Sequence, residues 1–331
     1  MLLSYYKAQG EVALITYIIR RLIQAVFILI ILTFIVFGVI RLVPGDPLLM
    51  YLSATDIEAL SPEALEQARH ELGLDKNLVV QYFTWLGDIL QGDFGKSFHF
   101  KEPVLQLISQ RLPITIHLGV FAFIFSSIIG IGLGIIAAVR RGRWADMVAT
   151  LAANTAITIP IFWLGIILIL ILGKYLDLLP IAGYTSPFDD FWLSTQKLVM
   201  PVICLMIYSM GANARLTRTS MLEVVRQDYV RTAWSKGLRE RAIIAKHALK
   251  NSLIPVVTVM GLQVRFIFGG AVLIEQVFAI PGMGRLLVDA TFGKDYLLVQ
   301  GSVLVIGIIV VLTNLIVDIS YGWLDPRVRY E

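Results

Sequence analysis

The chain has 331 residues, of which 57% are hydrophobic and only 16% are charged, whereas ordinary soluble domains carry about 25% charged residues. Its formal net charge is +4 at pH 7, and Cys204 is its only cysteine. This composition is typical of a membrane protein, and a single cysteine excludes an internal disulfide and a cysteine metal cluster. The small basic excess requires no nucleic-acid partner, because the placement of basic residues described below accounts for it.

Six segments are apolar over about 20 residues, the length that a helix needs to cross a bilayer. The fourth is the weakest, since it contains Pro201 and ends near Arg215. In chain order, the segments are residues 22–40, 114–139, 147–173, 198–216, 253–274 and 298–324. They predict an all-α polytopic membrane protein with six transmembrane helices and with both termini on the same side of the membrane.

The first span, residues 22–40, is predicted to be retained. Its apolar core is longer than the about 7 to 15 residues of a secretory signal peptide, and it leads into "RLVPGDP" rather than a small-residue cleavage site. Residues 1–11 are expected to be either a mis-assigned translation start or a small cytosolic extension.

Basic residues are unevenly divided between the two sides of the membrane. The segments on the side of the N-terminus hold 17 Lys and Arg, and the segments on the other side hold 10. The bias is strongest in "RRGR", residues 140–143, and in residues 215–252. Because basic residues in short loops stay inside, we predict that residues 1–21 and 325–331 are cytoplasmic and that residues 41–113 are extracytoplasmic.

The extracytoplasmic segment carries two local patterns. "SPEALEQARHELGLD" predicts a short amphipathic helix, with Ser61 as N-cap, Pro62 at the first position and Gly73 at its end. "GDFGKS", residues 92–97, is similar to the end of a phosphate-binding loop, but the first glycine of such a loop is replaced by Leu90. Since this segment faces outward, where there is no ATP, we expect no ATP site here, and the family resemblance given below implies that it is a structural turn.

The largest inner segment, residues 215–252, is predicted to be folded. Its apolar residues recur at helical spacing, and Gly237 marks a place where one helix ends and another begins. A segment of this length is too short to bury a core of its own. No soluble catalytic domain is therefore expected.

Enzyme signatures are missing from the sequence. It contains no His-Glu-x-x-His, no G-x-S-x-G and no clustered Cys and His with metal spacing. Asp318 stands nearly alone in the spans, so carboxylate pairs of the proton-relay type are also missing. We expect neither a catalytic residue nor a metal site in this chain.

The inner segment carries a recognisable pattern. "DYVRTAWSKGLRERAIIAKHALKNSLIPVVTVMG", residues 228–261, resembles the cytoplasmic loop of ABC importer permease subunits in the version of the dipeptide, oligopeptide and nickel permeases. "IRLVPGDP", "QYFTWLGDILQGDFGKS", "IPIFWLG", "GGAVLIEQVFAIPGMGRLLVDA" and "NLIVDISYGWLDPRVRY" are similar to the same family, in order, from about residue 18 to residue 330. The long segment after the first span resembles the B-type subunit.

The resemblance implies the type I ABC importer permease fold, with a small helical extracytoplasmic segment after the first span and a five-span core over residues 114–324. It implies one half of the pathway of an ATP-driven, binding-protein-dependent importer in a bacterial or archaeal inner membrane. Peptides are the expected solute, and nickel or another small solute such as glutathione stays open. An ion-coupled carrier or channel is the alternative from another class, which the scarcity of intramembrane carboxylates disfavours.

The partners implied by the resemblance are a homologous C-type permease subunit, two cytoplasmic ABC ATPase subunits, an extracytoplasmic substrate-binding protein and membrane lipid. No cofactor is expected in this chain, because ATP and Mg²⁺ would be used by the ATPase subunits.

The resemblance assigns ATPase coupling to a helix of the inner segment that docks in a groove of an ATPase subunit. Arg231 and Lys236 would contact acidic groups, Ala233 would permit close approach and Gly237 would make the turn. The full coupling set is Asp228, Arg231, Thr232, Ala233, Lys236 and Gly237. The alternative is a solvated inner helix whose basic charge serves topology.

Pro160, Gly211 and Asn213 bend the spans or free their backbone groups, so they are candidates for the translocation pathway, with helix packing as the alternative. Phe162 and Trp163 are candidates for the walls of the pathway, with aromatic residues at an interface as the alternative. The candidates are Pro160, Phe162, Trp163, Gly211, Asn213 and Arg265. Arg265 departs from the family, whose members commonly have a small residue here. We hypothesise that it faces a water-accessible path and favours solutes with a carboxylate; the alternative is a structural pair with a carboxylate such as Asp318.

The segment after the fifth span is a candidate outer gate beneath a docked binding protein. It comprises Glu275, Pro281, Gly282 and Gly284. A capped turn with no gating role is the alternative.

Overall fold

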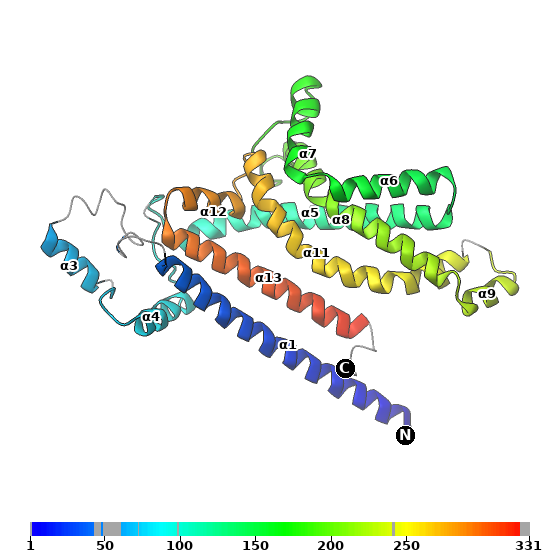
Figure 1. Ribbon diagram of the computed structural model, residues 1–331, viewed down its shortest axis with the longest axis horizontal. Coiled ribbons are helices and arrows are strands. Elements are labelled where there is room, and N and C mark those ends of the chain that lie inside the picture. The colour runs from blue at the N-terminus through cyan, green and yellow to red at the C-terminus, as the bar shows by residue number, and fades with distance from the viewer. Residues whose placement is uncertain are drawn as a thin grey trace. The chain divides into compact units, whose positions relative to one another are not determined.

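The computed structural model describes residues 2–42, 48, 61–71, 73–97, 99–239 and 242–324 of the chain. Within these residues the chain is helical, with one isolated antiparallel bridge between Lys96 and Pro103 (Figure 1). The elements, with π-helices labelled η, are α1 (Leu2–Arg41), α3 (Pro62–Glu71), α4 (Leu78–Leu90), α5 (Val104–Val139), α6 (Trp144–Thr158), α7 (Ile161–Leu168), η2 (Ile169–Tyr175), α8 (Phe191–Val224), α9 (Asp228–Ser235), η3 (Ile243–Leu249), α11 (Lys250–Val277), α12 (Met283–Phe292) and α13 (Tyr296–Leu324).

Among the described residues, five helices are long and apolar enough to cross a membrane, and a sharply bent pair of helices makes a sixth if the pair is counted as one span. The five are Thr16–Val39, Val104–Val139, Phe191–Val224, Lys250–Val277 and Tyr296–Val317. They contain the predicted second, fourth and fifth spans and most of the first and sixth, and several continue beyond them because polar residues at their ends are also helical. The sequence "RLVPGDP" and the C-terminal residues 325–331 lie largely or wholly outside the described residues.

The third predicted span, residues 147–173, is not one continuous helix. α6 ends at Thr158, α7 begins at Ile161, and the two are bent by 105°. Pro160 explains the break, because it has no backbone N–H and its ring disfavours a helical conformation of the residue before it. Ile159 is accordingly extended, with φ −70° and ψ 125°.

The contacts divide the chain into two compact units, the first drawn mainly from Ile116–Ile280 and the second from Arg20–Thr115 and Pro281–Leu312. In the first unit α8 packs against α6, α7 and α11 (Figure 1). Small residues permit this close packing, as they do between membrane helices generally. A Cβ atom on Gly211 of α8 would lie 2.5 Å from the Ala153 carbonyl oxygen of α6, and one on Gly134 of α5 would lie 2.6 Å from the Ala214 carbonyl oxygen of α8.

The second unit has its own apolar core. Val104 and Ile108 at the start of α5 pack with Met283 and Leu286 of α12 and with Leu298 of α13. Outside this core, the Thr33 hydroxyl of α1 and the Tyr82 hydroxyl of α4 are 2.9 Å apart. The buried Ser97 hydroxyl donates a hydrogen bond to the carboxylate of the equally buried Asp295.

The two local predictions for residues 41–113 are confirmed. The Ser61 hydroxyl oxygen accepts a hydrogen bond from the Ala64 N–H at 3.3 Å, and α3 begins at Pro62 and ends before Gly73, which has φ +65°. In "GDFGKS" the Asp93 carboxylate accepts a hydrogen bond from the Gly95 N–H at 2.8 Å, and Gly95 has φ +76°. These are the marks of a tight turn.

Candidate functional site

The predicted coupling helix is α9, which follows α8 after a turn of three residues. Asp228 lies in its first turn, where a carboxylate is stabilised by the helix dipole. At its other end, the Gly237 N–H donates to the Trp234 carbonyl at 2.9 Å, and Gly237 has φ +71°. Glycine adopts this left-handed conformation without a steric penalty, so it ends α9 sharply and redirects the chain toward η3.

One face of α9 is buried within the chain itself. Val230 is 0% exposed and Ala233 is 6% exposed, and both pack against Ile243 at the start of η3. Ala233 is predicted to permit close approach to an ATPase subunit; in this structure its small side chain lets α9 lie close to η3, and the role in docking stays a prediction. The packing holds α9 on the first unit.

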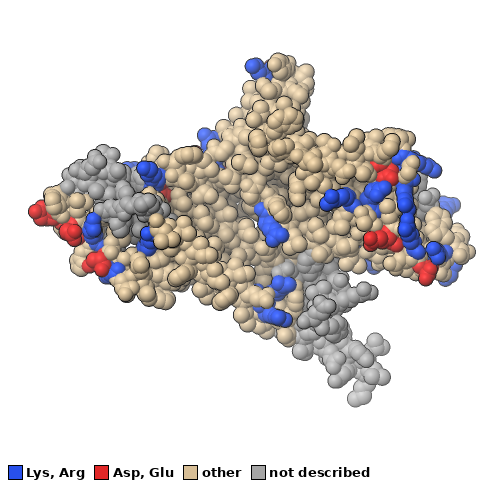
Figure 2. Space-filling view, viewed as in Figure 1, with Lys and Arg blue, Asp and Glu red and all other residues tan. Residues whose placement is uncertain are grey.

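The opposite face of α9 is free. The Arg231 and Asp228 side chains are 73% and 97% exposed and form an ion pair at 3.6 Å, while Trp234 and Lys236 are also exposed. The Thr232 hydroxyl donates to the Asp228 carbonyl at 2.9 Å. Figure 2 shows Lys and Arg gathered at the end of the first unit that carries α9. Exposed cations beside an exposed indole form a surface suited to an acidic partner.

An ion pair joins the helix ends next to α9. The Arg218 guanidinium of α8 donates to the Asp146 carboxylate of α6, with Nε to Oδ1 at 2.7 Å and Nη2 to Oδ2 at 3.0 Å. The same carboxylate accepts from the Gly142 N–H at 3.0 Å and from the Thr150 hydroxyl at 3.2 Å. Asp146 is 6% exposed, so its charge is fully committed to these four donors.

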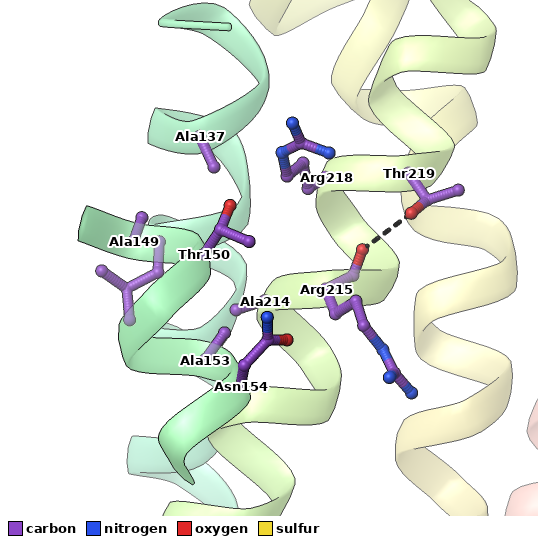
Figure 3. Close-up of a pocket in the computed structure, with 10 residues that line it drawn as sticks. Ala137, Ala149, Thr150, Ala153, Asn154, Ala214, Arg215, Arg218 and Thr219 are labelled. Atoms are coloured by element: carbon purple, nitrogen blue, oxygen red, sulfur yellow. Dashed lines mark hydrogen bonds between the residues drawn. The ribbon is translucent and has the colours of Figure 1, made fainter. Parts of the chain in front are cut away.

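Arg218 of this ion pair lines a cavity of about 240 Å³ (Figure 3). Ala149 and Asn154 of α6 line one wall, and Ala214, Arg215 and Arg218 of α8 line the other. The cavity separates parts of α6 and α8, two helices that pack closely against each other elsewhere. The arrangement leaves α6 and α8 joined by a polar clamp next to open space.

The predicted pathway residues fall into two groups. Gly211 and Asn213 are buried in helix packing on α8, and the Asn213 Oδ1 atom has no hydrogen-bond partner in the described part of the chain. Pro160, Phe162 and Trp163 are exposed around the break between α6 and α7. Only the second group therefore has exposed side chains, and Arg265, which belongs to neither group, is also exposed.

Arg265 lies at the middle of α11 and lines a larger cavity, of about 470 Å³. The same cavity is lined by Ile161 of α7, by Tyr208 and Ser209 of α8, and by Gly269 of α11. The break at Pro160 thus borders the cavity that contains Arg265.

The candidate outer gate is closely packed. Glu275 is 0% exposed, and its carbonyl accepts from the Ile280 N–H at 2.8 Å. Gly282 and Gly284 are buried at the start of α12, and the Pro281 carbonyl accepts from Arg111 at 3.4 Å. These are features of a capped turn, and the gate role stays a prediction.

Comparisons with known proteins cover nearly the whole chain. The family described as "Binding-protein-dependent transport system inner membrane component" matches residues 130–330, and the N-terminal family of the same membrane component matches residues 14–119. The chain belongs to this family. It is an inner-membrane permease subunit with several spans, and it works with other components of an ABC importer.

Several relatives of this permease carry named transport functions. A putative peptide transport system permease protein of Brucella suis is 41% identical over 317 residues, which cover 95% of this chain and 99% of the relative. Dipeptide transport system permease proteins of Alkalihalophilus pseudofirmus and Escherichia coli K12 are 38% and 37% identical, each covering 96% of this chain and 100% of the relative.

A solved structure supports the fold of the permease. The chain is similar to one from inward-facing conformations of the MetNI methionine ABC transporter, with a TM-score of 0.54 and 17% identity, covering 67% of this chain and 97% of the other. At this identity the likeness concerns the fold, which is that of a type I ABC importer permease.

Sequence reasoning missed the Asp146–Arg218 pair of this permease. The two residues are 72 positions apart, and nothing in either segment indicates which cation the acid contacts. The available signal was an acid in the first turn of a helix, directly after three arginines. In the described residues no group of three or more His, Cys, Asp or Glu side chains is placed to hold a metal ion.

Proposed function

We propose that this permease forms half of the translocation pathway of an ATP-driven importer of di- and oligopeptides. The support for peptides is that relatives at 37–41% identity, aligned over 95% or more of this chain, are named peptide or dipeptide permeases. We further propose the orientation in which both termini and α9 are cytoplasmic, because basic residues are concentrated in those segments.

The proposed partners follow from that orientation. A homologous C-type permease forms the other half of the pathway, two ABC ATPase subunits bind on the cytoplasmic side, and a substrate-binding protein delivers the solute from outside. ATP and Mg²⁺ are used by the ATPase subunits, and this chain supplies no catalytic residue. The exposed face of α9, with Arg231, Trp234 and Lys236, docks in the ATPase groove.

This function is supported most directly by α9, which is held in place by its buried face and leaves its other face exposed. α9 packs through Val230 and Ala233 on η3, which continues directly into α11. The chain also runs from α8 into α9, and α8 is clamped to α6 by Arg218 and Asp146. When the ATPase subunits close on ATP, a displacement of α9 is therefore passed to α8, α11 and α6, which exposes the pathway to the binding protein.

The test is uptake by the complete transporter in proteoliposomes. We expect uptake of a tripeptide that requires ATP inside the vesicle and binding protein outside it. A panel of di- to pentapeptides and Ni²⁺ chelates assigns the solute class. Uptake of Ni²⁺ chelates without uptake of any peptide would refute the peptide assignment, and uptake that survives without ATP but stops when the ion gradient is dissipated would identify an ion-coupled carrier.

A further inference from the structure

Arg265 is a cation in an apolar span with no acidic partner among the residues that the structure describes. Its nearest ring is that of Phe266, whose centroid is 5.5 Å from the guanidinium carbon. None of the described residues that line its cavity is acidic. Arg265 is exposed on this chain alone, and a guanidinium at the centre of a membrane helix is unfavourable unless it is paired or hydrated, so it needs water, an anion or an acidic group of another subunit.

The geometry places Arg265 where a solute passes. α11 has 28 residues, and Arg265 lies close to its middle, which is well inside the bilayer when the helix spans it. Transporter binding sites are commonly found at this depth. Gly269, one turn further along, leaves open space, because a Cβ atom there would meet nothing within 4 Å. The cavity of about 470 Å³ is large enough for part of a small peptide.

The beginning of α7 adds a second positive element to the same cavity. Ile161 is the first residue of α7 and lines the cavity, and no side chain caps this end of the helix. The first N–H groups of a helix have no partner within it, and together they carry a partial positive charge. In an apolar span these groups need water or an anion as an acceptor.

We propose that this cavity binds the free carboxylate of the transported solute, with Arg265 as the specificity-determining residue. The proposal rests on the proposed function, in which the solute is a short peptide with a free C-terminus. The guanidinium would donate two hydrogen bonds to the carboxylate, and the uncapped start of α7 would add to the favourable potential. Tyr208 lines the same cavity.

The experiment measures equilibrium binding of a radiolabelled tripeptide, as the free acid and as the C-terminal amide, to the complete transporter in nanodiscs without binding protein. We expect the free acid to bind at least about tenfold more tightly than the amide, since a charge-assisted contact is lost in the amide. Arg265→Gln should bring this ratio close to one, and Arg265→Lys should restore part of it. Lys174→Gln removes an exposed cation that does not line the cavity, so it should leave the ratio unchanged.

Two further variants keep the interpretation unambiguous. Gly269→Leu fills the open space and should weaken binding of the acid and the amide alike. A structural pair between Arg265 and Asp318 predicts instead that Arg265→Gln and Asp318→Asn lower thermal stability equally and leave the acid-to-amide ratio unchanged. That outcome, or no measurable binding of either peptide, would overturn the proposed carboxylate site. The proposed function would be unaffected by it, because ATP-driven uptake of peptides in proteoliposomes tests that function separately.

Discussion

Arg218 and Asp146 join the ends of α8 and α6 through two parallel hydrogen bonds, of 2.7 and 3.0 Å. Arg218 stands ten positions before α9 begins at Asp228, so the pair lies where the spans meet the candidate coupling helix. A bidentate pair of this kind fixes the angle between two helices as well as their distance. It therefore makes α6 and α8 move as one body when α9 is displaced.

Removal of either member of the pair is expected to destabilise the permease. Asp146→Asn and Arg218→Gln should each lower the free energy of unfolding by about 1–3 kcal/mol, because each leaves a largely buried polar group without its partner. Thermal unfolding of the complex, followed by tryptophan fluorescence, measures this. The double variant should lose less than the sum of the single losses, and strict additivity would show that the two side chains do not interact.

Two glycines of α5, near its crossing with α8, should respond differently when each is replaced by alanine. A Cβ atom on Gly134 would lie 2.5 Å from the Thr217 Cβ atom, whereas one on Gly132 would meet nothing within 4 Å. Gly134→Ala should therefore destabilise by about 1–3 kcal/mol through overpacking. Gly132→Ala should be neutral or stabilise by up to about 1 kcal/mol through helix propensity. Equal effects on thermal stability would contradict this helix crossing.

Gly237 and Gly142 provide a matched pair for the coupling role. Both are turn glycines with φ near +70° (+71° and +75°), and at both a Cβ atom would meet nothing within 4 Å. Alanine at either position should cost about 1–2 kcal/mol of backbone strain. Only Gly237→Ala should also reduce ATP hydrolysis stimulated by the binding protein, because only Gly237 orients α9. A similar loss of stimulated hydrolysis in both variants would argue against a specific role for α9.

The two faces of α9 should respond differently to substitution. Ala233→Leu is expected to lower thermal stability, since Ala233 is buried against η3. Trp234→Ala removes a side chain that is 47% exposed, and should change stability by no more than about 0.5 kcal/mol while weakening retention of the ATPase subunits. Co-purification of the complex at increasing salt measures that retention. Full retention by Trp234→Ala would exclude the indole from the docking surface.

The sequence predicts much of this fold because apolar length is sufficient to identify membrane helices. It also predicts the turn at "GDFGKS" and the capped start of α3, where local residues determine the backbone. It indicates a disturbance at Pro160 but not a bend of 105°, since a proline can kink a helix or end it, depending on what packs around it.

Parts of the candidate site could not be predicted because they depend on contacts between distant segments. The position of Ala233 in the sequence of α9 is the same whether its side chain faces an ATPase subunit or η3. Only the packing of Ile243 against Ala233 in the folded chain shows that it faces η3. The partner of Asp146 could not be chosen among the basic residues of the inner segments. Gly130 and Gly134, four positions apart, carried a small-residue signal for a close helix crossing, and the structure places both against α8.

The most direct test of the central claim is ATP hydrolysis by the complete transporter in nanodiscs, with this permease, its partner permease and both ATPase subunits present. We predict that loaded binding protein stimulates hydrolysis severalfold. Reversal of charge on the exposed face of α9, in Arg231→Glu combined with Lys236→Glu, should abolish the stimulation while the complex stays folded. Stimulation that is unaffected by these substitutions would contradict the assignment of α9 as the coupling element.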